Sequence, residues 1–152
     1  MLVNPKPQRL PPEQIGAYGF IASTETRWAD NDLYGHVNNA VYYQLFDSAV
    51  NRFLIEQGGL DIHSGAVIGL VVESSCRYHA PVAYPERIRV GVRVDRLGAS
   101  SVTYGVALFS ESDPSARADG TFTHVFVDRT SRRPAPMPEP LRAALQGLSR
   151  VS

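Results

Sequence analysis

The sequence has almost no cysteine, no excess of charge of either sign and no long apolar run. Cys76 is the single cysteine, so the chain cannot form an internal disulfide. The 15 basic and 15 acidic residues balance, which leaves no global field to attract a polyanion or an acidic membrane. Apolar runs end after a few residues, whereas crossing a bilayer takes roughly 20. We therefore expect a soluble cytoplasmic protein that binds neither nucleic acid nor a membrane.

Length and composition predict one compact domain. The chain has 152 residues, of which 43% are hydrophobic and 20% charged, as is usual for globular proteins. Most of the prolines lie near the two ends, where they would interrupt regular elements. We predict three parts, which are a proline-rich N-terminal arm over 1–16, a folded domain over 17–131 and a proline-rich tail over 132–152. Within the tail, residues 141–147 predict a short helix that ends at Gly147.

One amphipathic helix is predicted over residues 39–57. Large apolar residues recur there at the spacing of one helical face, with polar residues between them, at Tyr42, Leu45, Phe46, Ala49 and Phe53. Asn38 or Asn39 can cap the start by accepting from a free backbone N–H. The pair Gly58-Gly59 supplies the left-handed residue that ends many helices.

The other regular segments alternate between apolar and polar residues, as half-buried strands do. They lie at 18–27, 68–79, 88–95, 102–108 and 118–128, and a hairpin turn is predicted over 97–100. Consecutive strands joined by short connections predict an antiparallel meander, and the single long helix is the candidate to cover its apolar face. We therefore predict an α+β hot-dog fold, a five-stranded antiparallel sheet wrapped around one long central helix. Another α+β sandwich is the alternative.

The connection into the helix carries the most chemistry. It contains Asp30, Asp32, Gly35 and His36, followed by two asparagines at the start of the helix. A helix N-terminus offers free N–H donors and a partial positive charge that stabilise a negative oxygen. An oxyanion site beside a carboxylate suits acyl transfer. The same residue types also form ordinary turns and caps, and from the residues alone both interpretations stay open.

The string D-x-D-x-x-G-H-V-N-N, followed by a tyrosine-rich helix, closely resembles the 4-hydroxybenzoyl-CoA thioesterase family of the hot-dog superfamily. The likeness extends from about residue 18 to 130, through Arg77-Tyr78-x-x-Pro81 and the Leu97-Gly-x-x-Ser101 turn. It implies an acyl-CoA thioesterase that needs no cofactor beyond the coenzyme A of its substrate. It also implies self-association, as a homodimer or homotetramer.

The resemblance further implies roles for individual residues. Asp32, the second aspartate of the pair, becomes the catalytic nucleophile or general base, and the backbone N–H of Asn39 polarises the thioester carbonyl. Gly35 and His36 belong to the same catalytic loop, where His36 orients Asp32, contacts the thioester or only braces the loop. The predicted substrate-binding residues are Val37, Asn38, Tyr42, Arg96 and Ser101.

Several alternatives accompany this assignment. Asp47 lies eight residues past Asn39, where a second group of hot-dog thioesterases places its carboxylate. Asp30 is expected to brace the loop by pairing with Arg27. The stretch 98–101 lacks the basic cluster that some family members carry there, which puts the usual nucleotide clamp in doubt. The competing functions are a non-catalytic acyl-CoA binding protein and a hot-dog hydratase or dehydratase.

A metal site is not expected. The three histidines outside the loop, His63, His79 and His124, are widely separated and lack the spacing of a metal-binding motif. Cys76 has no obvious base partner, and we expect it to be a small buried apolar residue.

Overall fold

The structure is a computed structural model and describes residues 9–149, so parts of the predicted arm (1–8) and tail (150–152) lie outside the described residues. Its elements are, in chain order, η1 (Ile15–Ala17), β1 (Phe20–Glu25), η2 (Trp28–Asp30), α1 (Val41–Glu56), β2 (Val67–Tyr78), β3 (Arg87–Leu97), β4 (Ser101–Ser110), β5 (Ala118–Asp128) and α2 (Glu139–Gly147). The predicted order of one strand, one long helix and four further strands is confirmed.

The five strands form one antiparallel sheet in the order β1-β3-β4-β5-β2. The predicted meander is confirmed for β3, β4 and β5, but it is wrong for β2, which pairs with β5 at the far edge. The reason lies in residues 79–86, which contain Pro81 and Pro85 and make a long crossing rather than a tight hairpin. Val82 in this crossing is buried, and its carbonyl accepts the N–H of Val37 at 2.7 Å. The crossing therefore supports the loop that precedes α1.

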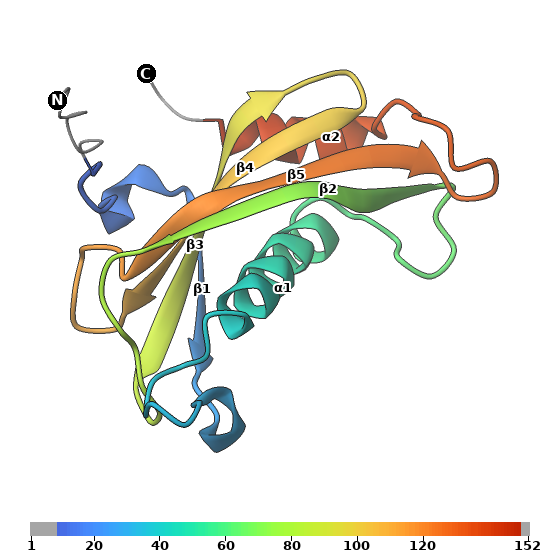
Figure 1. Ribbon diagram of the computed structural model, residues 1–152. Coiled ribbons are helices and arrows are strands. Elements are labelled where there is room, and N and C mark those ends of the chain that lie inside the picture. The colour runs from blue at the N-terminus through green and yellow to red at the C-terminus, as the bar shows by residue number, and fades with distance from the viewer. Residues whose placement is uncertain (1–8, 150–152) are drawn as a thin grey trace, which may run out of the picture.

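The long helix α1 lies against one face of the sheet (Figure 1). Phe46, Val50 and Leu54 of this helix are fully buried in the same apolar core as the inward residues of the strands. The helix begins at Val41, two residues later than predicted, because residues 39–40 form a turn. It ends as predicted, since Gly59 has a φ of +67°.

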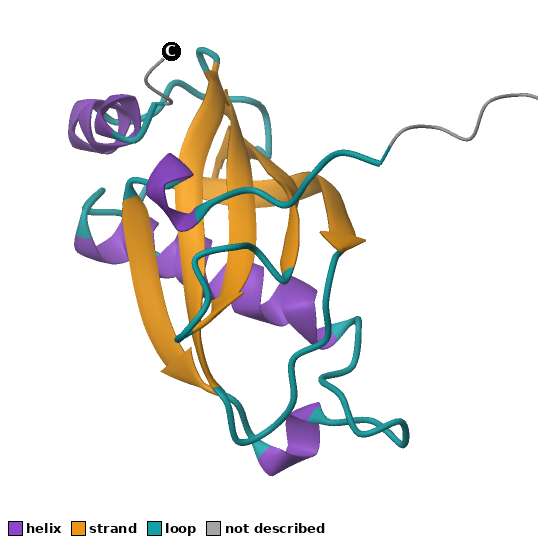
Figure 2. Cartoon of the chain, turned by 90° about the vertical axis from the view of Figure 1, so that its left-hand side faces the viewer, coloured by secondary structure: helices purple, strands orange, loops and turns teal. Residues whose placement is uncertain are grey.

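The short helix α2 belongs to the same core. Leu141 and Leu145 are buried there, and the N–H of Val94 donates to the carbonyl of Leu148 at 3.0 Å. This contact covers the part of β3 that extends beyond its pairing with β1. Figure 2 shows α2 at one end of the molecule and η2 at the other. The division of the chain into arm, domain and tail stays a prediction.

Candidate active site

The turn η2 is fixed by the buried carboxylate of Asp30, which is only 2% exposed. Its two oxygens accept the backbone N–H of Arg27 at 2.8 Å and the Arg27 Nη2 at 2.8 Å. The Asp30 carbonyl also accepts the N–H of Asn38 at 2.8 Å. The expected pairing with Arg27 is confirmed, and Asp30 ties the start of the loop to its end.

Asp32 begins a tight turn beyond η2. Its Oδ1 accepts the N–H of Tyr34 at 2.8 Å, while its own N–H donates to the carbonyl of His36 at 2.9 Å. Gly35 closes the turn with a φ of +84°, a backbone conformation that residues other than glycine rarely adopt. Within residues 9–149, no hydrogen bond reaches Oδ2 of Asp32 or the imidazole of His36. Asp32 thus shapes the turn with one oxygen and has the other available.

The backbone at the start of α1 is held on both sides of Asn39. The side chain of Asn38 accepts the N–H of Ala40 at 2.9 Å, and its carbonyl accepts the N–H of Val41 at 2.9 Å. The hydroxyl of Tyr78 donates to the carbonyl of Asn39 at 2.7 Å. In the part of the chain that the structure describes, no acceptor is present for the N–H of Asn39. This N–H is therefore a donor at the start of the helix that is free to bind an oxyanion.

Two open pockets meet at Asn39. The loop pocket, of about 670 Å³, is lined by Trp28, Asn31, Asp32, Leu33, Tyr34, Gly35, Asn38 and Asn39. The β2 pocket, of about 310 Å³, is lined by His36, Val37, Asn39, Tyr42, Tyr78, His79, Ala80 and Pro81. Seven of the nine residues predicted for the site line these two pockets, and Asn39 lines both.

Tyr78 was not among the predicted site residues, although its string Arg77-Tyr78-x-x-Pro81 is part of the resemblance. Its ring packs edge to face on Tyr42, with 5.0 Å between the centroids. Its neighbours Arg77 and His79 both contact the buried carboxylate of Asp119, each at 2.9 Å. Burial raises the pKa of Tyr78, which keeps its hydroxyl protonated and able to donate.

Comparison with known proteins supports the chemistry suggested by this geometry. The family model described as the thioesterase-like superfamily matches residues 26–145. The chain belongs to this superfamily. The predicted resemblance is confirmed, and the protein is a thioester hydrolase.

Several solved structures share the fold of this thioesterase over most of its length. The PA5185 protein from Pseudomonas aeruginosa strain PAO1 is 56% identical, covers 93% of this chain and 99% of its own, and has a TM-score of 0.91. The PA2801 protein from Pseudomonas aeruginosa is 32% identical over 85% of this chain and 98% of its own, with a TM-score of 0.77. Slr0204, a 1,4-dihydroxy-2-naphthoyl-CoA thioesterase from Synechocystis, shares the fold at 22% identity, over 85% and 96%, with a TM-score of 0.76. No curated protein matches the chain.

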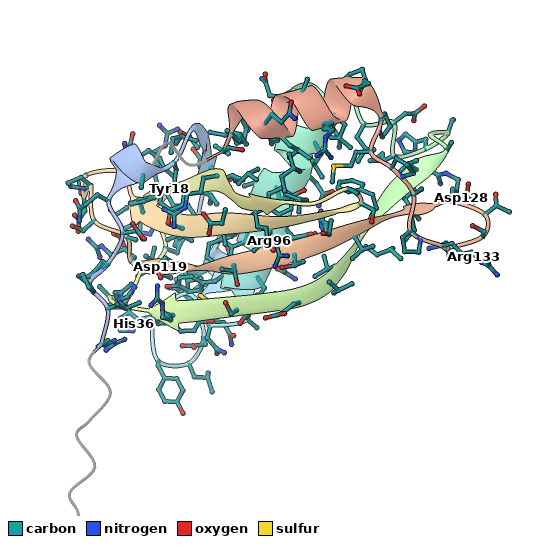
Figure 3. All side chains as sticks on the ribbon, turned by 90° about the horizontal axis from the view of Figure 1, so that it is seen from above. Tyr18, His36, Arg96, Asp119, Asp128 and Arg133 are labelled. Carbon is teal, nitrogen blue, oxygen red and sulfur yellow. The ribbon has the colours of Figure 1, made fainter. Side chains whose placement is uncertain are left out.

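Two residues predicted to bind the substrate of the thioesterase lie away from both pockets. Arg96 is exposed near the end of β3, where it pairs with Thr103, and Ser101 begins β4. Figure 3 shows His36 at one end of the sheet and Arg96 farther along it. Within one chain, Arg96 and Ser101 are therefore not brought to Asn39.

The alternative carboxylate, Asp47, is exposed on α1 and accepts the side-chain N–H of Asn51 at 3.1 Å. It lines a separate pocket between α1 and the end of β1, together with Gln44 and Ser48. One chain of the thioesterase thus places Asp32, but not Asp47, in a pocket with Asn39.

The described part of the thioesterase contains neither a cluster of metal ligands nor a membrane-spanning helix. Among residues 9–149, no group of three or more His, Cys, Asp or Glu side chains lies together as a metal site would require. In the same range, no helix has the length and apolar character needed to span a bilayer. Cys76 is half-buried, and burial raises the pKa of its thiol to about 11, so it is a poor nucleophile.

Proposed function

We propose that this thioesterase hydrolyses the thioester of an acyl- or aroyl-CoA to a free carboxylic acid and coenzyme A. The observation that carries the proposal is the position of Asn39. Its backbone N–H has no acceptor within the described residues, it lines both pockets, and one of those pockets also contains Asp32. We place the acyl group in the loop pocket and the pantetheine arm in the β2 pocket.

Asp32 then acts on the thioester in one of two ways. As a nucleophile, its carboxylate oxygen bonds to the carbonyl carbon, the C–S bond breaks and the thiolate of coenzyme A leaves; water then cleaves the mixed anhydride and regenerates Asp32. As a general base, Asp32 takes a proton from the water that attacks the carbonyl directly; the C–S bond then breaks, and the thiolate of coenzyme A leaves and takes up the proton. In both routes the N–H of Asn39 stabilises the negative charge on the carbonyl oxygen, an effect typically worth about 10²–10³ in rate.

We propose the full hot-dog arrangement for the sheet and helix, and a homodimer or homotetramer for the assembly. The edge strand β2 supports self-association, since Leu70, Val71 and Val72 are exposed on it beside unpaired backbone groups. The exposed loop residues Leu33 and Tyr34 are further apolar surface that a second copy would cover.

The reaction as proposed needs no cofactor apart from the coenzyme A of the substrate. A thiolate is a good leaving group, so a carboxylate and one N–H donor suffice and no metal or strong general acid is invoked. We also propose a cytoplasmic location, which the single cysteine supports.

A thiol-release assay across a panel of acyl- and aroyl-CoA substrates tests this function. The matched control is Asp32→Asn, which keeps the size of the side chain and the acceptor for the Tyr34 N–H but removes the negative charge. We expect release of coenzyme A with at least one substrate class and a loss of about 10²-fold or more in the variant. Equal rates for both proteins would contradict the proposed mechanism.

A further inference from the structure

We propose that Asp119 is a positioning residue for the oxyanion donor, although it lies outside both pockets that contain Asn39. Its carboxylate holds the side chains of Arg77 and His79, and this fixes Tyr78 between them. We call Asp119, Arg77 and His79 the β2 clamp. The inference rests on the proposed function, because it concerns the N–H of Asn39 that we assign to the thioester carbonyl.

The acceptor sites of the Asp119 carboxylate are fully used by the protein. Oδ1 accepts Nε and Nη2 of Arg77 at 3.1 and 2.9 Å, and Oδ2 accepts the backbone N–H of Glu13 at 3.2 Å. Oδ2 also lies 2.9 Å from Nε2 of His79, which therefore carries the proton, because a carboxylate can only accept. Four donors thus converge on one buried carboxylate.

The clamp acts on the end of β2. Side chains alternate along a strand, so Tyr78 faces α1 while Arg77 lies on the opposite face of the sheet, where Asp119 is its partner on β5. Tyr78 pairs with Ala118 in the last position of the β2–β5 ladder, and β2 is the edge strand. Figure 3 shows Asp119 at the same end of the sheet as His36, which lines the β2 pocket. The clamp therefore holds both neighbours of the residue at which the edge strand ends.

Tyr78 carries this restraint to the candidate active site. Its hydroxyl donates to the carbonyl of Asn39 at 2.7 Å. Hydrogen bonds weaken steeply as their geometry departs from the optimum, so a displaced Tyr78 would leave the backbone of Asn39 free to rotate. An oxyanion donor acts within about 2.7–3.1 Å of the oxygen that it stabilises. A small displacement of the Asn39 N–H would therefore lower the rate.

Asp119 and Asp30 are the only buried carboxylates among residues 9–149, and both restrain segments that bond to the backbone at residues 38 and 39. Asp30 shapes the turn η2, and its carbonyl accepts the N–H of Asn38 at 2.8 Å. Asp119 holds the end of β2, from which Tyr78 donates to the carbonyl of Asn39. The peptides that flank the proposed donor are thus fixed by segments that the two buried carboxylates hold.

Stability alone does not account for this use of buried charge. Taking an ion pair out of water costs about as much as the pair returns, and apolar residues of similar volume often stabilise a fold at least as well. A buried carboxylate with several donors adds direction, because charge-assisted hydrogen bonds are short and geometrically specific. Fixed geometry is what an oxyanion donor requires.

A double-mutant cycle between Asp119→Asn and Tyr78→Phe tests the β2 clamp. Asp119→Asn keeps the shape of the side chain and removes its charge. For one hydrolysed acyl-CoA we expect it to lower kcat about three- to tenfold with KM unchanged, the size of the one hydrogen bond that Tyr78 makes. In the Tyr78→Phe background the same change should not lower kcat further, because the hydroxyl through which the clamp acts is already missing. The melting temperature should fall in both backgrounds.

Arg77→Lys is the second variant and decides the question if Asp119→Asn does not fold. It keeps the positive charge beside Asp119 but loses the paired hydrogen bonds of the guanidinium. It should lower kcat about threefold with the Tyr78 hydroxyl present and leave kcat unchanged in the Tyr78→Phe background. Losses of kcat that are equal in both backgrounds, or wild-type kcat in both clamp variants, would overturn the proposal.

Asp113→Asn is the matched control. Asp113 lies in the β4–β5 connection, where its side chain is 37% exposed and pairs with Arg117. This variant also removes one carboxylate charge beside an arginine, and it should keep the kcat and KM of the wild type.

The backbone amide resonance of Asn39, measured without substrate in a ¹H–¹⁵N spectrum, separates this proposal from the proposed function. We expect Asp119→Asn and Tyr78→Phe both to move this resonance, and Asp113→Asn to leave it in place. If the resonance moves as expected but no thioester is hydrolysed, the clamp stands and only the proposed function fails. If thioesters are hydrolysed and the resonance does not move in Asp119→Asn, the function stands and the clamp is wrong.

Discussion

The hydroxyl of Tyr78 donates a hydrogen bond of 2.7 Å to the carbonyl of Asn39, which joins the end of β2 to the start of α1. The opposite side of the same peptide is held by Asn38, whose side chain accepts the N–H of Ala40. The preceding peptide is also fixed, because the carbonyl of Asn38 accepts the N–H of Val41. Hydrogen bonds on both sides of Asn39 therefore set the direction of its N–H. Tyr78 is therefore a positioning residue for the proposed oxyanion donor.

Replacing Tyr78 by phenylalanine should lower kcat about three- to tenfold with little change in KM. The variant keeps the ring that packs on Tyr42 and loses only one hydrogen bond, worth about 1 kcal/mol. Steady-state kinetics together with thermal unfolding check this. The control is Tyr84→Phe, an exposed tyrosine outside both pockets, which should behave as wild type. If Tyr78→Phe raises KM alone, Tyr78 binds substrate and does not position Asn39.

Gly35→Ala should reduce turnover far more than stability. A Cβ at this position would meet no atom within 4 Å, so the cost is confined to the positive φ and amounts to about 1–2 kcal/mol. The turn would relax and move Asp32, and kcat should fall about 10²-fold, which exceeds the stability cost. Gly147→Ala, which also has open space but no positive φ, is the control. Parallel losses of melting temperature and activity in Gly35→Ala would favour a purely structural turn.

Val72→Lys should dissociate the proposed dimer. Val72 is 60% exposed and lies at the bulge of the edge strand β2, where a lysine opposes pairing with a second copy. Light scattering at micromolar concentration should give about two or four times the chain mass for wild type and a smaller mass for the variant. Ile55→Lys, at an exposed apolar residue of α1, is the matched control. A wild-type protein of single mass would contradict the assembly.

Acidification should destabilise the fold through His124. This histidine is 2% exposed, and burial lowers its pKa from the usual 6.5, with the charge of Asp47 opposing the shift. The unfolded chain binds a proton on this histidine below about pH 6.5, whereas the folded chain binds it only at a lower pH. The stability present above that pH is therefore lost as the pH falls through the folded pKa. Each pKa unit of depression is worth about 1.4 kcal/mol of stability, or roughly 3–6 °C in the melting temperature.

Thermal unfolding between pH 7.5 and 5 measures this effect, and His124→Gln should flatten the dependence. Asp61 and Asp128 have lowered pKa values through backbone hydrogen bonds, but they titrate below their usual 3.8 and act outside this window. The same slope in wild type and His124→Gln would show that another group is responsible.

Much of the fold could be predicted because its signals are local. The period of apolar residues placed α1 within two residues of its true start, and strict alternation placed β3 and β4. The position of β2 could not be predicted in this way. Strand order depends on whether residues 79–86 form a hairpin or cross to the far edge of the sheet. Val82 in this segment is buried only in the finished core, so no local pattern indicates the crossing.

The site was predictable where its residues are adjacent in sequence. Asp32, Gly35, His36 and Asn39 form one short string, and the fold places them around two pockets that share a residue. Tyr78 was missed as a site residue because it lies about 40 residues after Asn39, and no local pattern connects the two. Only the pairing of β2 with the sheet brings it there.

Single-turnover hydrolysis of one good acyl-CoA by Asp32→Asn and Asp47→Asn tests the central claim most directly. With Asp32 as nucleophile or general base, Asp32→Asn should slow the chemical step about 10²-fold or more while substrate affinity changes little. Asp47 lines a separate pocket and contacts Asn51, so Asp47→Asn should lower the single-turnover rate less than about tenfold. Loss of turnover in Asp47→Asn with normal turnover in Asp32→Asn would contradict the account and assign the reaction to the helix carboxylate.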